Sequence, residues 1–264
     1  MKKQMKYFFG FLLLYSNVYG QTNISWSHGG IIRGDTTQKS IALIFSADAD
    51  GEGVPFIDSV LHSENIKGSF FFTGNYLTNP ENKMWIESLI NHGNYISTHS
   101  YGHLLYCDWA NRDSLLVTQE TFNSDMDKSF AILKQFDILK SKASYFLPPY
   151  EWYNDTISTW ARQAGLQVIE FTPGTYSNAD YTTPDMGKKY LSSNTIFNRI
   201  LHFESAHKSG LNGFFLLVHA GSSPLRTDKF YWKLPALLKV LKSKGYRFFR
   251  VDELIEGKRI GNEY

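Results

Sequence analysis

The sequence predicts an α/β fold built on about seven parallel strands. Seven short apolar runs, most of them rich in β-branched or aromatic residues, read as buried strands. Stretches with helical spacing lie between them, and several of these stretches end at a glycine. Such alternation is typical of parallel sheets, but it does not distinguish a closed barrel from an open, doubly wound sheet.

Each expected element can be placed along the chain. The strands are expected at residues 41–45, 69–72, 95–98, 143–147, 166–171, 214–218 and 246–251. The helices are expected at residues 56–64, 84–91, 114–136, 155–164, 195–208 and 232–244.

Residues 1–20 have the features of a signal peptide. Lys2, Lys3 and Lys6 precede an apolar stretch at residues 7–15, and small residues follow near Gly20. The apolar stretch has roughly half the length of a membrane span, although an uncleaved membrane anchor is the alternative. We therefore expect a secreted or periplasmic protein whose residues 21–264 form a single catalytic domain.

The charge of the mature chain argues against nucleic acid as a partner. Without the three leader lysines, the chain has 24 basic and 25 acidic residues, which gives a net charge of −1. It also has no basic stripe. The single cysteine, Cys107, cannot form an internal disulfide, and we expect it to be a small buried side chain.

Polar residues follow four of the expected strands. These residues are Asp48 and Asp50, the pair His99 and His103, residues 149–152, and His219. The carboxyl ends of parallel strands meet on one face of the fold, so we expect one site there.

The two histidines are candidate metal ligands. Imidazoles four residues apart can reach one borderline ion such as Zn²⁺ from a helical turn or a tight loop. The alternative is that one histidine caps a helix while the other is exposed.

The acidic segment at residues 48–52 could complete such a site. One carboxylate would be a metal ligand and a second would be a general base for a metal-held water. A solvated acidic turn is the alternative. A calcium loop needs more oxygen ligands than the segment provides.

Two further segments suit hydrolysis of a glycan. His219 leaves a buried strand at the expected site and could be a general acid, although a hydrogen-bonded core histidine is the alternative. Residues 148–153 combine two prolines with three aromatic side chains, which suit either stacking on sugar rings or packing under a loop.

With these motifs in order, residues 40–254 resemble the polysaccharide deacetylase family (carbohydrate esterase family 4). The His-Ser-Tyr-Gly-His motif at residues 99–103 matches the family's His-Ser/Thr-x-x-His motif, and Leu217-Val218-His219 matches its last motif. The resemblance implies a distorted (β/α) barrel and a carbohydrate substrate. It also implies one divalent metal ion, expected to be Zn²⁺, with Co²⁺ or Ni²⁺ as alternatives.

The resemblance also implies a role for each site residue. Asp50, His99 and His103 would bind the metal, Asp48 would be the base, and His219 would protonate the leaving group. Two extra residues after Phe45 leave the reverse assignment of the two aspartates open. Pro149, Tyr150 and Trp152 would contact the substrate, and the backbone near Tyr150 would stabilise the oxyanion.

The chain departs from the family pattern at two places. Leu147 stands where the family has an arginine that orients the base, and the fourth motif is not recognisable around residues 170–180. The leading hypothesis is a metal-dependent carbohydrate deacetylase. The alternatives are a non-catalytic glycan-binding protein with the same fold and a metal-dependent hydrolase of another amide C–N bond.

Overall fold

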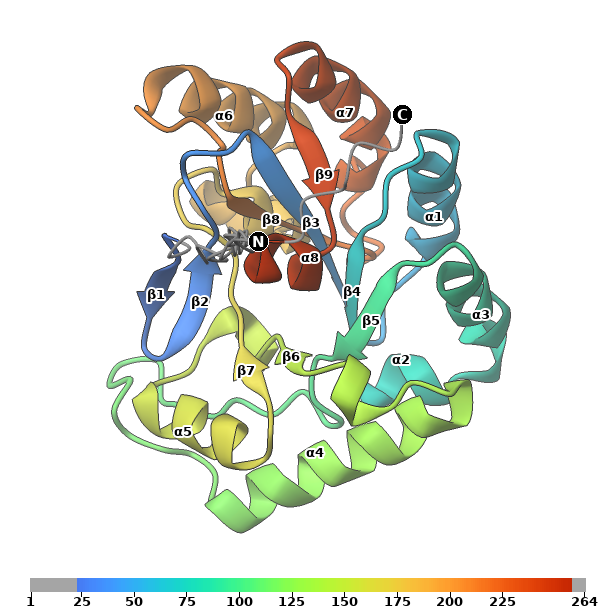
Figure 1. Ribbon diagram of the computed structural model, residues 1–264, viewed down its shortest axis with the longest axis vertical. Coiled ribbons are helices and arrows are strands. Elements are labelled where there is room, and N and C mark those ends of the chain that lie inside the picture. The colour runs from blue at the N-terminus through green and yellow to red at the C-terminus, as the bar shows by residue number, and fades with distance from the viewer. Residues whose placement is uncertain (1–22, 258–264) are drawn as a thin grey trace, which may run out of the picture.

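The computed structural model describes residues 23–257. The expected signal peptide at residues 1–20 lies outside this range. A curled sheet forms the centre of the molecule, and helices surround it (Figure 1). In the described part of the chain, no helix combines the length and the apolar character that crossing a bilayer requires.

All seven expected strands are present. The parallel strands β3, β4, β5, β8 and β9 belong to one sheet, and β6 and β7 form a separate parallel pair. Their bounds are β3 Ser40–Ala47, β4 Ser69–Phe72, β5 Tyr95–Thr98, β6 Tyr145–Phe146, β7 Gln167–Val168, β8 Phe214–His219 and β9 Arg247–Phe249.

The expectation that all strands are parallel needs a correction, because the sheet is mixed. A hairpin of β1 (Ser25–Ser27) and β2 (Gly30–Arg33) precedes the expected strands, and β2 pairs antiparallel with β8. His28 and Gly29 both have positive φ, 45° and 74°, in the turn between them. Two such residues give a turn whose twist matches the flanking strands.

The short β6–β7 sheet closes the curl into a distorted barrel. On one side, the backbone N–H of Leu147 donates to the carbonyl of Thr98, which ends β5, at 3.3 Å. On the other side, Ile31 of β2 forms a parallel bridge with Ile169, just after β7. These contacts join the two sheets into a curled, distorted barrel, as the resemblance implies.

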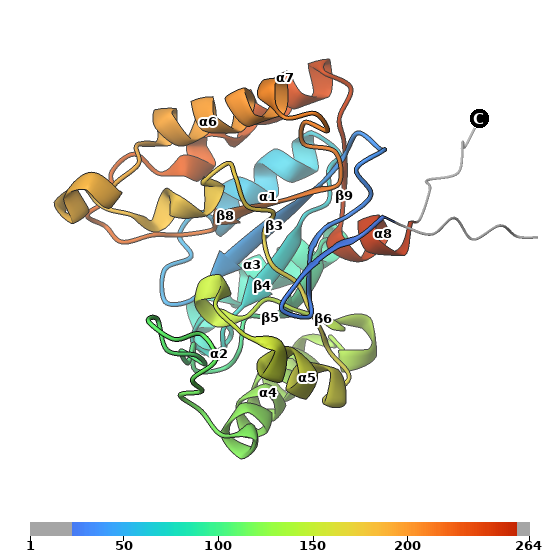
Figure 2. The ribbon, with the colours of Figure 1, turned by 90° about the vertical axis from the view of Figure 1, so that its left-hand side faces the viewer.

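The six expected helices are also present, and the structure has two further short helices, α2 and α8. Helices α1, α6 and α7 cover one side of the barrel, and α4 and α5 cover the opposite side (Figure 2). The bounds are α1 Val54–Ser63, α2 Gly74–Thr78, α3 Lys83–Asn91, α4 Gln119–Leu133, α5 Asp155–Gln163, α6 Ser193–Ala206, α7 Leu234–Ser243 and α8 Val251–Glu256.

Helix α4 begins five residues later than the pattern predicts. Its N-cap is Thr118, whose side chain accepts the backbone N–H of Thr121, so residues 104–117 are free to form a loop. This loop runs beside the candidate site.

Strand β3 is buried on both faces, which explains its unbroken apolar run. Ile41, Leu43 and Phe45 pack with the outer helices, whereas Ala42 and Ile44 pack inside the barrel. Burial of both faces fixes the register of β3. The residues that follow it are thereby held at the carboxyl end of the barrel.

Candidate active site

The strands that carry the expected site residues end next to one another. Ser46 of β3 pairs with His219 at the end of β8, and Phe72 of β4 pairs with Thr98 at the end of β5. Asp48, His99 and His219 therefore start from adjoining strand ends, as predicted.

The imidazole of His99 is buried and held as a neutral donor. Its Nδ1 lies 2.8 Å from the carbonyl oxygen of Leu147, which can only accept, so Nδ1 carries the proton. Burial, together with the nearby His103, lowers the pKa of His99 to about 3. The lone pair of Nε2 is thus available near neutral pH. A hydrogen bond from the other ring nitrogen to a backbone carbonyl is typical of metal-binding histidines.

A tight turn, rather than a helix, brings His103 back towards His99. Ser100 and His103 have positive φ, 73° and 51°, and the Asp125 carboxylate accepts the backbone N–H groups of Tyr101 and Gly102. The ring centroids of the two histidines lie 5.0 Å apart. Burial lowers the pKa of His103 as well, and the Asp48 carboxylate partly opposes this effect.

Of the two candidate aspartates, Asp48 is the one placed beside the histidines. Its Oδ1 accepts the Thr73 hydroxyl at 2.8 Å and the Asn75 amide at 3.0 Å. Burial opposes ionisation of Asp48, but these two bonds and the nearby His103 outweigh it and lower its pKa. Asp50 is exposed. The structure therefore favours the reverse of our first assignment, with Asp48 as the carboxylate ligand.

The donor set of Asp48, His99 and His103 suits a borderline divalent ion in its chemistry. The two imidazoles are neutral at physiological pH and the carboxylate is ionised. Both side-chain bonds of Asp48 end on Oδ1. As they stand, no three His, Cys, Asp or Glu side chains within residues 23–257 are grouped closely enough to hold a metal.

His219 forms a charged pair with Asp180 across the barrel end. Its Nδ1 lies 2.6 Å from Asp180 Oδ1, and its backbone N–H donates to Oδ2 at 2.9 Å. Burial lowers the pKa of His219, but the Asp180 carboxylate outweighs burial and raises it above the usual range. The Asp180 carboxylate thus favours the protonated form of His219, which is the form that a general acid needs.

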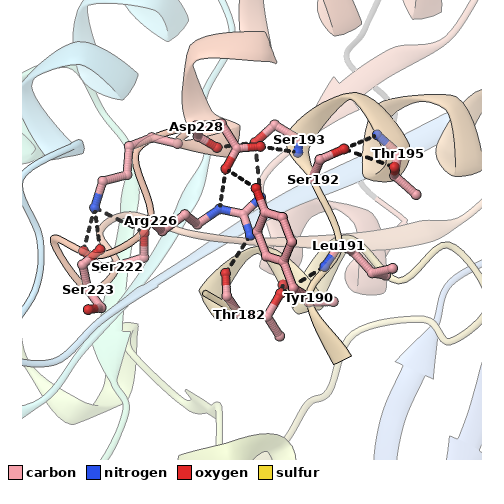
Figure 3. Close-up of polar contacts among 12 residues, drawn as sticks. Thr182, Tyr190, Leu191, Ser192, Ser193, Thr195, Ser222, Ser223, Arg226 and Asp228 are labelled. Carbon is pink, nitrogen blue, oxygen red and sulfur yellow. Dashed lines mark hydrogen bonds and ion pairs between the residues drawn. The ribbon is translucent and has the colours of Figure 1, made fainter. Parts of the chain in front are cut away.

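A buried arginine fixes the segment that carries Asp180. Arg226, fully buried in the loop after β8, donates to the carbonyl of Thr182 at 2.7 Å and to the Ser193 hydroxyl at 3.0 Å (Figure 3). Its Nε lies 3.6 Å from a carboxylate oxygen of Asp228, which also accepts the Tyr190 hydroxyl. Thr182 lies two residues after Asp180, so this network holds the partner of His219 in place.

Two more carboxyl groups lie in this region, Glu151 beside His219 and the largely buried Glu170 beside Glu151. Glu151 is 9% exposed, and burial raises its pKa to about 7, against the opposing effect of His219. Burial also raises the pKa of Glu170 to about 7, although the Tyr153 hydroxyl donates to it at 3.0 Å. Tyr150 and Glu151 both have positive φ, 60° and 50°. Such backbone strain in bulky residues concentrates at functional sites.

The three expected substrate contacts differ in their exposure. Tyr150 is 45% exposed and its ring centroid lies 4.5 Å from that of His103. Trp152 is half-buried, with Arg112 over its face at 3.7 Å. Pro149 is buried, so of the three Tyr150 presents the most side-chain surface to a ligand.

Leu147 and Cys107 are both core residues. Leu147 is fully buried inside the barrel and provides the carbonyl that orients His99. Cys107 is buried as expected, and burial raises the pKa of its thiol.

Comparison with known proteins identifies the family. Residues 33–169, just over half of the chain, match the family model described as polysaccharide deacetylase. The chain belongs to this family. Its sequence is 26% identical over 233 residues to a peptidoglycan-N-acetylglucosamine deacetylase, PgdA, of Listeria monocytogenes. That match covers 86% of the chain but only 41% of the relative, so the chain spans about two fifths of the Listeria protein.

A shorter relative and two solved structures match more completely. A peptidoglycan-N-acetylglucosamine deacetylase of Bacillus cereus is 24% identical, and the match covers 84% of the chain and 90% of the relative. The Bc1960 peptidoglycan N-acetylglucosamine deacetylase superposes with a TM-score of 0.67 at 20% identity, over 85% of this chain and 92% of that one. A CE4 family pseudoenzyme of Bacillus anthracis superposes with a TM-score of 0.68 at 20% identity, over 89% of this chain and 72% of that one. At these identities the superpositions establish the fold.

Two residues of this region were not predicted from the sequence. Asp180 lies in a short 3₁₀ helix (Ser177–Tyr181), 39 residues before His219, and matches no expected motif. Trp109 is 57% exposed and lies in the loop that the periodicity partly assigned to a helix. The acidic side chain itself was the only available signal for Asp180, and nothing in the sequence pointed to Trp109.

Proposed function

We propose that the protein is a metal-dependent deacetylase acting on an acetylated glycan. The observation that carries this proposal is the arrangement at the carboxyl end of the barrel. Two neutral imidazoles and the ionised Asp48 lie there together with the hydrogen-bonded His219–Asp180 pair, in which the carboxylate raises the pKa of the imidazole. Metal ligands and a general acid are what hydrolysis of an acetyl group requires.

Each residue has a defined task in this proposal. Asp48, His99 and His103 would hold a divalent ion, which when bound polarises the acetyl carbonyl and lowers the pKa of water. His219 donates its Nε2 proton to the leaving group, and Asp180 stabilises the imidazolium. A backbone N–H near Tyr150 donates to the oxyanion.

The proton of the attacking water needs an acceptor other than Asp48. Asp50 is exposed, whereas Glu151 is buried and interacts electrostatically with His219. We therefore assign the base to Glu151. Glu151→Gln should lower kcat by at least about 10²-fold while the bound metal is retained. Unchanged kcat in this variant, with a loss in Asp50→Asn, would return the role to Asp50.

We further propose N-acetylglucosamine units of a cell-wall polymer as the substrate class. The relatives named above support this choice, since their names specify peptidoglycan. A secreted or periplasmic location follows from that substrate and from the expected signal peptide.

The test is a double variant, His99→Ala with His103→Ala. Loss of both zinc content and acetate release from acetylated glycans is the expected result. His202→Ala with His207→Ala is the matched control, because both of these side chains are exposed on or next to α6. Full metal retention in the first variant would overturn the metal site.

A non-catalytic glycan-binding protein is the second candidate. Leu147 in place of the expected arginine favours it, because no buried cation is then available at that position to orient a base. Steady acetate release by the unmodified protein, abolished by a chelator, would exclude this candidate. Release of other acyl groups from amides would instead indicate a different C–N hydrolase.

A further inference from the structure

Two exposed aromatic rings lie next to the candidate active site. Trp109 is 57% exposed and Tyr150 is 45% exposed, and their ring centroids lie 5.7 Å apart with the rings nearly perpendicular. The Tyr150 ring also contacts His103, at 4.5 Å between centroids. We refer to Trp109 and Tyr150 together as the aromatic platform. It extends outward from the expected metal ligand.

The loop that carries Trp109 is tightly folded. Cys107 and Leu115 form an antiparallel β-bridge through their backbones, and the backbone N–H of Asp108 donates to the carbonyl of Ser114 at 2.9 Å. The Asp108 side chain accepts the backbone N–H groups of Ala110 and Asn111, at 2.8 and 2.9 Å. Trp109 is thus held at the tip of an ordered turn.

The same loop is anchored to the segment that follows Tyr150. The indole N–H of Trp152 donates to the Asp108 carbonyl at 3.2 Å, and Asn154 donates to the Arg112 carbonyl at 3.0 Å. Trp152 lies against Trp109, at 5.5 Å between ring centroids, and Arg112 covers the Trp152 ring. These contacts fix Trp109 before any ligand binds, which lowers the entropic cost of binding.

We propose that the aromatic platform is a binding subsite for a sugar ring that adjoins the acetylated residue of the glycan. A pyranose ring has an apolar C–H face that packs on aromatic side chains. The loop that carries Trp109 also has exposed polar side chains, Asn111 and Asp113, which can hydrogen-bond to sugar hydroxyls. The platform is continuous with His103, so a chain whose acetyl group lies at the histidines would extend across it. This placement of the occupant rests on the proposed function.

The subsite predicts a dependence on substrate length. In the unmodified protein, kcat/KM should rise from the N-acetylglucosamine monomer to its β-1,4-linked oligomers. Trp109→Ala should lower kcat/KM for the pentamer by about 10-fold, through KM, and leave the monomer almost unchanged. Trp109→Phe should recover part of the loss. Trp26→Ala is the control, because Trp26 is 55% exposed but lies on the edge strand β1.

Direct binding separates this subsite from the deacetylase activity. Titration of the pentamer into the chelator-treated protein, with and without Trp109→Ala, requires no catalysis and keeps His103 beside Tyr150. Weaker binding only when Trp109 is absent supports the platform, even if no acetate is ever released. Equal affinity in both proteins, or no binding of the pentamer to either, would overturn it. Circular dichroism of the variants checks that the fold is intact.

Discussion

The Nδ1 atom of His219 lies 2.6 Å from Oδ1 of Asp180, a residue 39 positions earlier in the chain. The carboxylate also accepts the backbone N–H of His219, so it fixes both the orientation and the tautomer of the ring. Its charge raises the pKa of His219 despite burial.

Asp180→Asn should therefore disable the acid without unfolding the site. The neutral amide removes the charge that keeps His219 protonated, so the pKa of His219 should fall and kcat should drop by about 10² to 10³-fold. Acetate release and NMR titration of the imidazole measure the two effects. Asp185→Asn, an exposed residue five positions along, should leave both unchanged. An unaltered imidazole titration in Asp180→Asn would contradict the assignment.

The two aspartates after β3 should differ in their effect on metal content. Asp48→Asn replaces the carboxylate beside His103 with a neutral amide, which is a poorer metal ligand. The amount of bound zinc measured after dialysis should therefore fall at least about 10-fold. Asp50→Asn should retain the metal, because Asp50 is exposed. The opposite pattern would restore the assignment that the family motif first suggested.

Replacement of Arg226 should loosen the segment that carries Asp180. Arg226→Met removes the buried hydrogen bonds to Thr182 and Ser193 and leaves the partly exposed Asp228 without its cation, a loss of roughly 1–3 kcal/mol in the free energy of unfolding. Urea unfolding measures this loss, and acetate release should fall as well because the His219–Asp180 pair is less well held. Arg199→Ala, an exposed arginine on α6, is the control. Equal stability of the two variants would contradict the role of Arg226.

The buried Glu170 should make the protein less stable as the pH rises. Its pKa is raised to about 7 by burial, above its value in the unfolded chain, so the folded state binds more protons between roughly pH 4.5 and pH 7. The stability associated with this group is thus present at low pH and is lost as the pH rises through about 7.

Glu170→Gln removes this titration but keeps an acceptor for Tyr153. At pH 8 the variant should be more stable than the unmodified protein by on the order of 1–3 kcal/mol, and at about pH 4 the difference should nearly vanish. Thermal unfolding in the presence of a chelator measures both conditions. A constant difference across this pH range would show that the carboxyl does not titrate there.

Much of the fold follows from local patterns. The seven strands are recognisable because residues buried on both faces give short, continuous apolar runs, as in β3. Helices α3, α5 and α7 stop near Gly93, Gly165 and Gly245, each with a positive φ that glycine adopts without strain. The β1–β2 hairpin was missed because only three to four residues form each of its strands.

The candidate site, like the fold, could be predicted from the sequence only in part. The sequence by itself determined the family resemblance and the histidine and acid motifs at the strand ends, because parallel strands bring their carboxyl ends to one face. Only the tertiary structure decided that Asp48 rather than Asp50 lies beside His103, that Asp180 partners His219, and that Trp109 stands beside Tyr150. These relationships join loops that are distant in sequence, and loop conformation depends on long-range contacts that leave no periodic signal in the chain.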